Sequence, residues 1–178
     1  ENPNTPLLKN LFQAFQNLSC LKNLSLNLLE YEVSEQDLIY LAQMFQNLGS
    51  LQNLSLTLGH EYLQGKSFEV LFKGIAHLDL SSFLFHIKQI DSDYYLPNHK
   101  KLGRNDEITS LFSAICGFTS LTSLDLNLLT FYIFEEDIKN LSVALKDLKD
   151  LTHLSIEVFC ITLEIYSLVY KRSQSSSF

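Results

Sequence analysis

The amino-acid sequence predicts an α/β solenoid of about five strand-turn-helix repeats, with a parallel sheet on the concave side and helices on the convex side. The segment LKNLSLNL at 21–28 returns as LQNLSLTL at 51–58. Apolar residues within each copy alternate with period two, as in a strand with one buried face. Before each copy they recur at spacings of three and four, as in an amphipathic helix. Such a unit buries its apolar surface only against neighbouring copies, so the copies must stack.

The predicted strands follow the first leucine of each copy, which we use as an anchor. The anchors are Leu21, Leu51, Leu80, Leu121 and Leu151. Three of the four intervals between successive anchors are nearly equal, and the one between Leu80 and Leu121 is longer than the others. In the first copy, Leu24, Leu26 and Leu28 form the alternating apolar set. The third copy, LSSFLFHI, is the most divergent and carries phenylalanine at two of these positions.

The predicted helices precede the anchors and carry four matched apolar columns. The columns are Leu8, Leu38, Phe68, Ile108 and Ile138; Leu11, Leu41, Leu71, Leu111 and Leu141; Phe15, Phe45, Ile75, Ile115 and Leu145; and Leu18, Leu48, Leu78, Phe118 and Leu148. Their spacings of 3, 4 and 3 place one residue of each column on the same helical face. The segment SEQD at 34–37 has the pattern of a capping box, so a helix is predicted to begin after Ser34.

The sequence predicts a single domain over residues 1–170 and a flexible tail over 171–178, KRSQSSSF. The long interval places an insertion at 88–107. The segment 159–170 still follows the repeat pattern, because Leu168 occupies the position of Leu38. We expect one or both ends of the solenoid to be covered by further chain or by a partner, since terminal repeats otherwise expose apolar faces.

The LxxLxLxL strand followed by a long amphipathic helix resembles the leucine-rich repeats of the ribonuclease-inhibitor-like type. The variant of the repeat with the extra strand leucine is similar to repeats common in ciliated protists. The resemblance spans residues 8–168 and implies a protein-binding role, because members of this family bind many different proteins.

One feature departs from this family, which usually places an asparagine shortly after the strand, where its amide bonds the neighbouring backbone. The two columns that could hold it contain none. They are Leu29, Gly59, Lys88, Leu129 and Phe159, and two residues later Tyr31, Glu61, Ile90, Phe131 and Ile161. We therefore expect the backbone groups of these turns to find other partners.

Charge and cysteine content narrow the class of function. The net charge of −7 and the pI near 5.1 argue against nucleic acid as a partner. Cys20, Cys116 and Cys160 are an odd number without short spacing, which fits neither a disulfide framework nor a zinc site. We therefore expect a cytoplasmic or other reducing intracellular compartment, including a cytoskeletal or ciliary one. No apolar run reaches the roughly 18 residues of a membrane span.

Polar residues that alternate with the strand leucines are predicted to point outward. They include His86, Asp125 and His153, which we regard as candidate partner-binding residues. With Ser123 or Ser155 they could suggest a catalytic triad. An open sheet, however, excludes no water and offers no oxyanion hole. We predict no catalytic, cofactor-binding or metal-binding residue, and we expect a protein that is not an enzyme.

The insertion carries the other candidate partner-binding residues, which combine aromatic and basic side chains. They are Tyr94, Tyr95, Lys100, Lys101 and Arg104. Aromatic residues and arginine are enriched at interface centres. The alternative is a loop that only tolerates extra length.

These observations favour a non-catalytic protein-protein interaction or scaffold module, as a subunit or fragment of a larger assembly. Its expected partners are proteins, with no cofactor, no nucleic acid and no membrane insertion. The alternative is a regulator or inhibitor that binds and occludes a partner enzyme.

Overall fold

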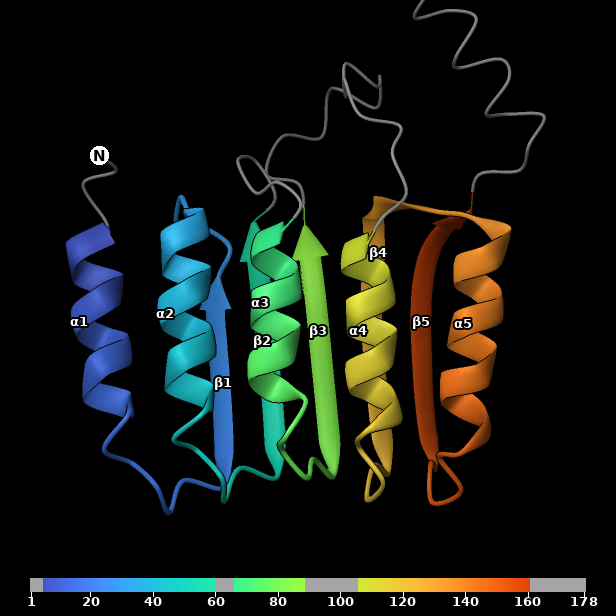
Figure 1. Ribbon diagram of the computed structural model, residues 1–178, viewed down its shortest axis with the longest axis horizontal. Helices are drawn as coiled ribbons and strands as arrows, with labels where there is room; N and C mark the ends of the chain where they lie inside the picture. Colours follow the sequence, from blue (N-terminus) through green and yellow to red (C-terminus); the bar gives the residue numbers. More distant parts are fainter. Residues whose placement is uncertain (1–4, 60–65, 89–105, 161–178) are drawn as a thin grey trace, which may run out of the picture.

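The structure, a computed structural model, describes residues 5–59, 66–88 and 106–160 and has two layers (Figure 1). Five helices cover one face of a five-stranded sheet, and helices and strands alternate along the chain. The elements are α1 (Thr5–Phe15), β1 (Asn23–Leu28), α2 (Glu35–Phe45), β2 (Asn53–Gly59), α3 (Lys66–Ile75), β3 (Ser82–Lys88), α4 (Asp106–Cys116), β4 (Ser123–Ile133), α5 (Glu135–Lys146) and β5 (His153–Cys160). The predicted α/β class, with five parallel strands and five helices, is confirmed.

The strands lie in sequence order, β1-β2-β3-β4-β5, and every neighbouring pair is parallel. Their register matches the predicted columns, because Leu26, Leu56, Phe85, Leu126 and Ile156 pair in succession across the sheet. A slip of one residue would turn each of these side chains to the opposite face of its strand. The repeat pattern therefore fixes both the pairing and the buried face.

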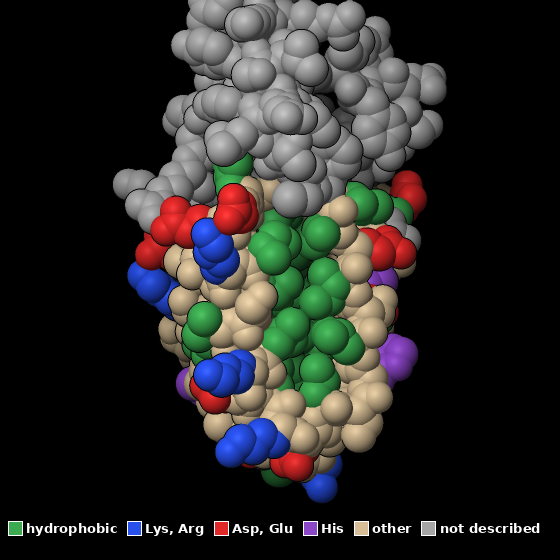
Figure 2. All heavy atoms as spheres, turned by 90° about the vertical axis from the view of Figure 1, so that its right-hand side faces the viewer, with side chains coloured by type: hydrophobic (Ala, Val, Ile, Leu, Met, Phe, Trp, Pro, Cys, Tyr) green, Lys and Arg blue, Asp and Glu red, His purple; other side chains and the backbone are tan. Residues whose placement is uncertain are grey.

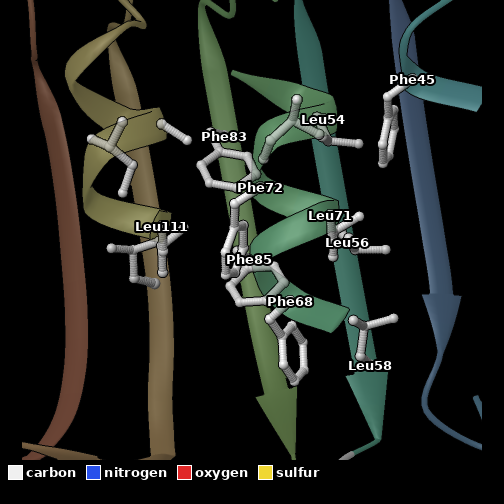
Figure 3. Close-up of a cluster of buried hydrophobic side chains, with 14 of the residues drawn as sticks. Phe45, Leu54, Leu56, Leu58, Phe68, Leu71, Phe72, Phe83, Phe85 and Leu111 are labelled. Carbon is white, nitrogen blue, oxygen red and sulfur yellow. The ribbon is translucent and has the colours of Figure 1, made fainter. Parts of the chain in front are cut away.

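The core is one continuous layer of side chains between the sheet and the helices (Figure 3). Its centre is aromatic, because Phe68, Phe83 and Phe85 of the third repeat stand where other repeats have leucine or isoleucine, and Phe72 packs against two of these rings. The ring of Phe72 lies 5.2 Å from that of Phe85 in an edge-to-face arrangement, and Phe68 lies 6.0 Å from Phe72. These rings fill the space between α3 and β3 with the geometry that aromatic pairs prefer.

The capping box predicted before α2 is present. The Asp37 backbone N–H donates to Ser34 Oγ at 3.2 Å, and the Ser34 N–H donates to Asp37 Oδ2 at 2.9 Å. Two N–H groups that the helix leaves unpaired are thereby satisfied. A related bond begins α5, where the Phe134 N–H donates to Asp137 Oδ2 at 2.9 Å.

The turn after β1 and the irregular part of β4 use asparagine from a position that the sequence comparison did not consider. Asn27 Oδ1 accepts from the Leu29 N–H at 3.1 Å, and Asn127 Oδ1 accepts from the Leu129 N–H at 3.4 Å. Both asparagines lie inside their strands, two residues before the columns counted in the sequence. The expectation that backbone groups of these columns find other partners is therefore met by the N–H groups of Leu29 and Leu129.

Strand β4 is longer than the sequence motif indicates. The motif ends at Leu128, but the strand continues to Ile133 after an irregularity in the pairing between Leu128 and Tyr132. Beyond this point Tyr132 pairs with Phe159 of β5. The segment LLTFYI is rich in residues that favour strands, so it pairs where other repeats turn.

In the described part of the chain, no helix is long and apolar enough to cross a membrane. The longest helix, α5, has 12 residues, whereas a span needs about 20.

Candidate functional site

The side chains that point away from the helices form a polar surface, which we call the open sheet face. All of its members are exposed or half-buried. They are Asn23, Ser25, Asn27, Asn53, Ser55, Thr57, Ser82, Leu84, His86, Ser123, Asp125, Asn127, His153, Ser155 and Glu157. The predicted outward direction of these residues is therefore confirmed, because the apolar strand residues between them, apart from Leu154, belong to the core or pack against it.

Hydrogen bonds between neighbouring strands order parts of this face. Asn53 Nδ2 donates to Asn23 Oδ1 at 2.5 Å, linking β2 to β1. On the other side, Asn127 Nδ2 donates to Glu157 Oε2, linking β4 to β5. Cross-strand pairs of this kind hold side chains in one orientation, so the face presents a fixed pattern of donors and acceptors.

His86 and Asp125 form the ionisable centre of the open sheet face. His86 pairs in register with Asn127, and Asp125 lies two residues earlier on β4, as the sequence predicted. His86 Nε2 lies 3.1 Å from Asp125 Oδ1, with 22% and 29% of the two side chains exposed. The nitrogen is buried but not aligned for a hydrogen bond, so the contact is electrostatic and depends on protonation of the imidazole.

The strand register separates Ser123 and Ser155, the serines of the suggested triad, from His86. Ser123 pairs with Ser82, four residues before His86 on β3, which corresponds to about 13 Å along the strand. Ser155 lies on β5, two strands away from β3. A nucleophilic hydroxyl must lie within about 3 Å of its histidine base. The residues of the suggested triad are therefore not brought together.

His153, the third candidate on the strands, is exposed at the start of β5 and pairs in register with Ser123. It lies two strands away from His86. It is in register with the start of β3, whereas His86 lies near the end of that strand. The two histidines therefore belong to different parts of the open sheet face.

The candidates in the insertion, Tyr94, Tyr95, Lys100, Lys101 and Arg104, lie outside the described residues. The positions to which this segment is attached are nevertheless defined. Strand β3 ends at Lys88 and α4 begins at Asp106, both at the edge of the molecule where the strands end (Figure 1). The insertion is therefore attached beside the carboxyl edge of the open sheet face.

The described residues contain no group of three or more His, Cys, Asp or Glu that could hold a metal ion. Cys20 and Cys116 are free thiols at the surface. Partial burial raises the pKa of the Cys116 thiol, and the negative charge of Asp147 raises it further. Cys116 is therefore less readily ionised than an ordinary surface thiol.

The two ends of the solenoid expose residues that are core positions elsewhere. Leu154 of β5 is 49% exposed, whereas its register partner Leu124 is 0% exposed. At the other end, Leu18 is 44% exposed, whereas Leu48 in the next repeat is fully buried. Figure 2 shows the resulting apolar strip between α5 and β5. We call this strip the C-terminal end face; its residues are Ile138, Leu145, Leu151, Leu154, Ile156 and Val158.

No protein-family model matches this chain, and no curated protein matches its sequence.

Proposed function

We propose that this protein is a leucine-rich-repeat module that binds a protein partner and does not catalyse a reaction. The observation that carries the proposal is the open sheet face, on which five aligned strands present small polar side chains without a water-excluding site. Catalysis of acyl transfer would need a nucleophile, a base and oxyanion donors in contact. The separation of Ser123 and Ser155 from His86 supports a binding role instead.

The size of the open sheet face supports a partner that also contacts the neighbouring insertion. Five strands about 4.8 Å apart give the face a width of roughly 19 Å. Strands of about six residues give it a length of roughly 20 Å. This area of roughly 400 Å² is about half of what one partner contributes to a standard interface. The insertion is attached beside this face, so Tyr94 and Tyr95 are suitably connected to supply the remaining contact.

The charge of the open sheet face favours a partner with a basic surface. Its fixed charges are Asp125 and Glu157, and none of the members that define it is a lysine or an arginine. The whole chain is also acidic, with a net charge of −7. Complementary charge steers association and suppresses wrong partners, so we propose a protein partner that presents lysine or arginine to strands β3–β5.

The proposed setting is a larger assembly in a reducing intracellular compartment. The free thiols of Cys20 and Cys116 support the compartment, because surface thiols persist where the environment keeps them reduced. A regulator that occludes an enzyme would use the same face, and it would be recognised by concentration-dependent loss of the enzyme's activity.

A matched pair of variants tests the proposed surface. Ser155→Arg places a bulky positive charge on β5 of the open sheet face, at the register partner of Asp125, and Ser113→Arg makes the same change on the exposed side of α4. Partners captured by wild type from native lysate, and identified by quantitative mass spectrometry, should be lost with the first variant and retained with the second. Equal retention by both variants would refute binding at this face.

The role of the insertion is tested in the same assay by changing Tyr94, Tyr95, Lys100 and Lys101 together to alanine. We expect weaker capture of the partners whose binding is also lost with Ser155→Arg. If this variant retains all of them, the insertion does not contribute to the interface.

A further inference from the structure

The C-terminal end face is apolar along its whole length, although α5 and β5 belong to a regular repeat. Ile138, Ile156 and Val158 are half-buried, whereas the equivalent residues Ile108, Leu126 and Leu128 are 0% exposed. In the interior of the solenoid, the helix of the next repeat covers these positions. Something that resembles the beginning of another repeat would therefore fit this face.

The segment that follows β5 has the residues for this contact. When the sequence is aligned with itself so that Leu151 falls on Leu21, the residues after β5 fall on those between β1 and β2. Val33, just before α2, and Leu38, near the start of α2, are 3% and 0% exposed and belong to the same apolar core as the inward-facing residues of β1. Their equivalents in this alignment are Leu163 and Leu168. The two buried apolar residues that follow β1 are thus repeated in the sequence after β5.

A second contact between the first two helices is repeated in the same way. The ammonium of Lys9 lies 5.4 Å from the centre of the Tyr40 ring, an arrangement typical of a cation-π interaction. Under the same alignment, the equivalents of this pair are Lys139 on α5 and Tyr170. Lys139 is at the surface, and its ammonium lies 2.9 Å from Glu135 Oε1. It occupies the position in α5 that Lys9 occupies in α1, where the side chain faces α2. A tyrosine placed like Tyr40 would lie over it.

The pattern changes after residue 170. Leu41 and Phe45 are fully buried in α2, but their equivalents are Lys171 and Ser175. Side chains of this kind are suited to solvent rather than to a further apolar layer. The segment therefore combines an apolar first turn with a polar continuation, which is the composition of a covering element with a polar outer surface.

We propose that residues 161–170 of this chain dock on the C-terminal end face. Leu168 covers Ile156 and Val158 near the end of β5, and the Tyr170 ring lies over the Lys139 ammonium. Helices begin at the edge where strands end (Figure 1), so this contact covers the part of the face near that edge and leaves Leu154 open. This inference is independent of the proposed function, because it concerns an end of the solenoid and not the open sheet face.

Hydrogen-deuterium exchange on the full chain tests the proposal with an internal comparison. Backbone amides of residues 161–170 should exchange about tenfold to hundredfold more slowly than those of 171–178, which is the protection that burial of one leucine can supply. Equal rates in the two segments would overturn the proposal. Protection that increases with protein concentration would assign the face to a second copy of the chain and would also overturn it.

Two substitutions of neighbouring residues separate docking from a general effect of added charge. Leu168→Asp should abolish the protection of 161–170. Val169→Asp introduces the same charge one residue later, at the position equivalent to Ile39, Glu69 and Thr109, which tolerates polar side chains. It should therefore preserve the protection. If both variants behave alike, Leu168 does not make the proposed contact.

A fluorescent reporter provides a second measurement that does not depend on a destabilising change. The chain has no tryptophan, so Tyr170→Trp introduces a single one in a position where an aromatic ring is retained. Its emission should be quenched by acrylamide several-fold less than that of Val143→Trp, at a position 62% exposed on α5. Equal quenching would place the residue 170 ring in solvent and overturn the proposal.

Discussion

The exposed ends of the solenoid lead to a prediction about two equivalent leucines. Leu54 and Leu154 occupy the same position in β2 and β5, as the first inward-pointing residue of each strand. Leu54 is 1% exposed and Leu154 is 49% exposed. Truncation to alanine therefore removes the same atoms from two environments that differ mainly in whether a further repeat covers them.

The expected losses of stability follow from this difference in burial. Leu54→Ala should lower the free energy of unfolding by about 3 kcal/mol, because it removes a fully buried side chain and leaves a cavity. Leu154→Ala should lower it by about 1 kcal/mol, because about half of the side chain is already in water and no closed cavity forms. The two variants should therefore differ by about 2 kcal/mol.

Urea unfolding followed by far-ultraviolet circular dichroism measures both losses by linear extrapolation. Wild type and both variants are compared at one protein concentration, so that any association contributes equally. Losses that agree within about 0.5 kcal/mol, the usual limit of additivity errors, would refute the reasoning. Such a result would mean that the lower part of the C-terminal end face is as well covered in solution as the interior.

Two further predictions concern a helix contact and a thiol. A Cβ on Gly74 would lie 2.8 Å from the Cα of Ala42, so Gly74→Ala should separate α2 from α3 and cost about 1–3 kcal/mol in thermal unfolding. A Cβ on Gly49 would meet no atom within 4 Å, so Gly49→Ala should change the free energy of unfolding by less than about 0.5 kcal/mol. Similar losses for the two variants would contradict the close approach of Gly74 to Ala42. Because the negative charge of Asp147 adds to burial in raising the Cys116 pKa, Asp147→Asn should speed alkylation of this thiol at pH 8. Mass spectrometry measures the alkylation rate of Cys116. An unchanged rate would show that the charge of Asp147 does not raise the Cys116 pKa.

The direction of the change in thiol reactivity depends on which form of the thiol reacts. The thiolate is the nucleophile, and a raised pKa lowers the thiolate fraction at a given pH below that pKa. Removing the charge of Asp147 lowers the Cys116 pKa and increases that fraction. The exposed thiol of Cys20 in the same molecule provides the control for reagent concentration and pH.

Most of the fold could be predicted from the sequence because the apolar periods constrain it strongly. The alternating leucines determine the buried face of each strand, and a one-residue error would have exposed a whole set of them. The capping box at Ser34 and Asp37 was also readable, because both residues act within one helical turn.

The features that the sequence did not reveal depend on contacts between repeats. The extension of β4 to Ile133 requires pairing with Phe159 and Cys160 of β5, which no local pattern indicates. Similarly, the close approach of Gly74 to Ala42 depends on how two helices pack. Asn27 and Asn127 were predicted as outward-facing polar residues, but their bonds to the backbone N–H groups two residues later became visible only with the backbone in place.

The candidate site was predictable to a similar extent. The alternation identified the open sheet face, and the repeat offset placed His86 beside Asp125. The sequence could not show that Asn127, opposite His86, is held by Glu157, because that contact depends on side-chain rotamers. The aromatic and basic residues of the insertion remain predictions, since residues 89–105 lie outside the described part of the chain.

The regularity of the repeats indicates where recognition can be located. Inward-facing positions have nearly the same chemistry in every repeat, because each must pack against the next. Outward-facing positions differ: β1 and β2 carry only amide and hydroxyl groups, whereas β3–β5 carry all the ionisable side chains of the open sheet face. Packing does not require this asymmetry, since these side chains lie outside the core. If the open sheet face binds a partner as proposed, the concentration of ionisable groups on β3–β5 favours one binding area over these strands. Binding of a basic partner should then depend more on Asp125 than on any residue of β1.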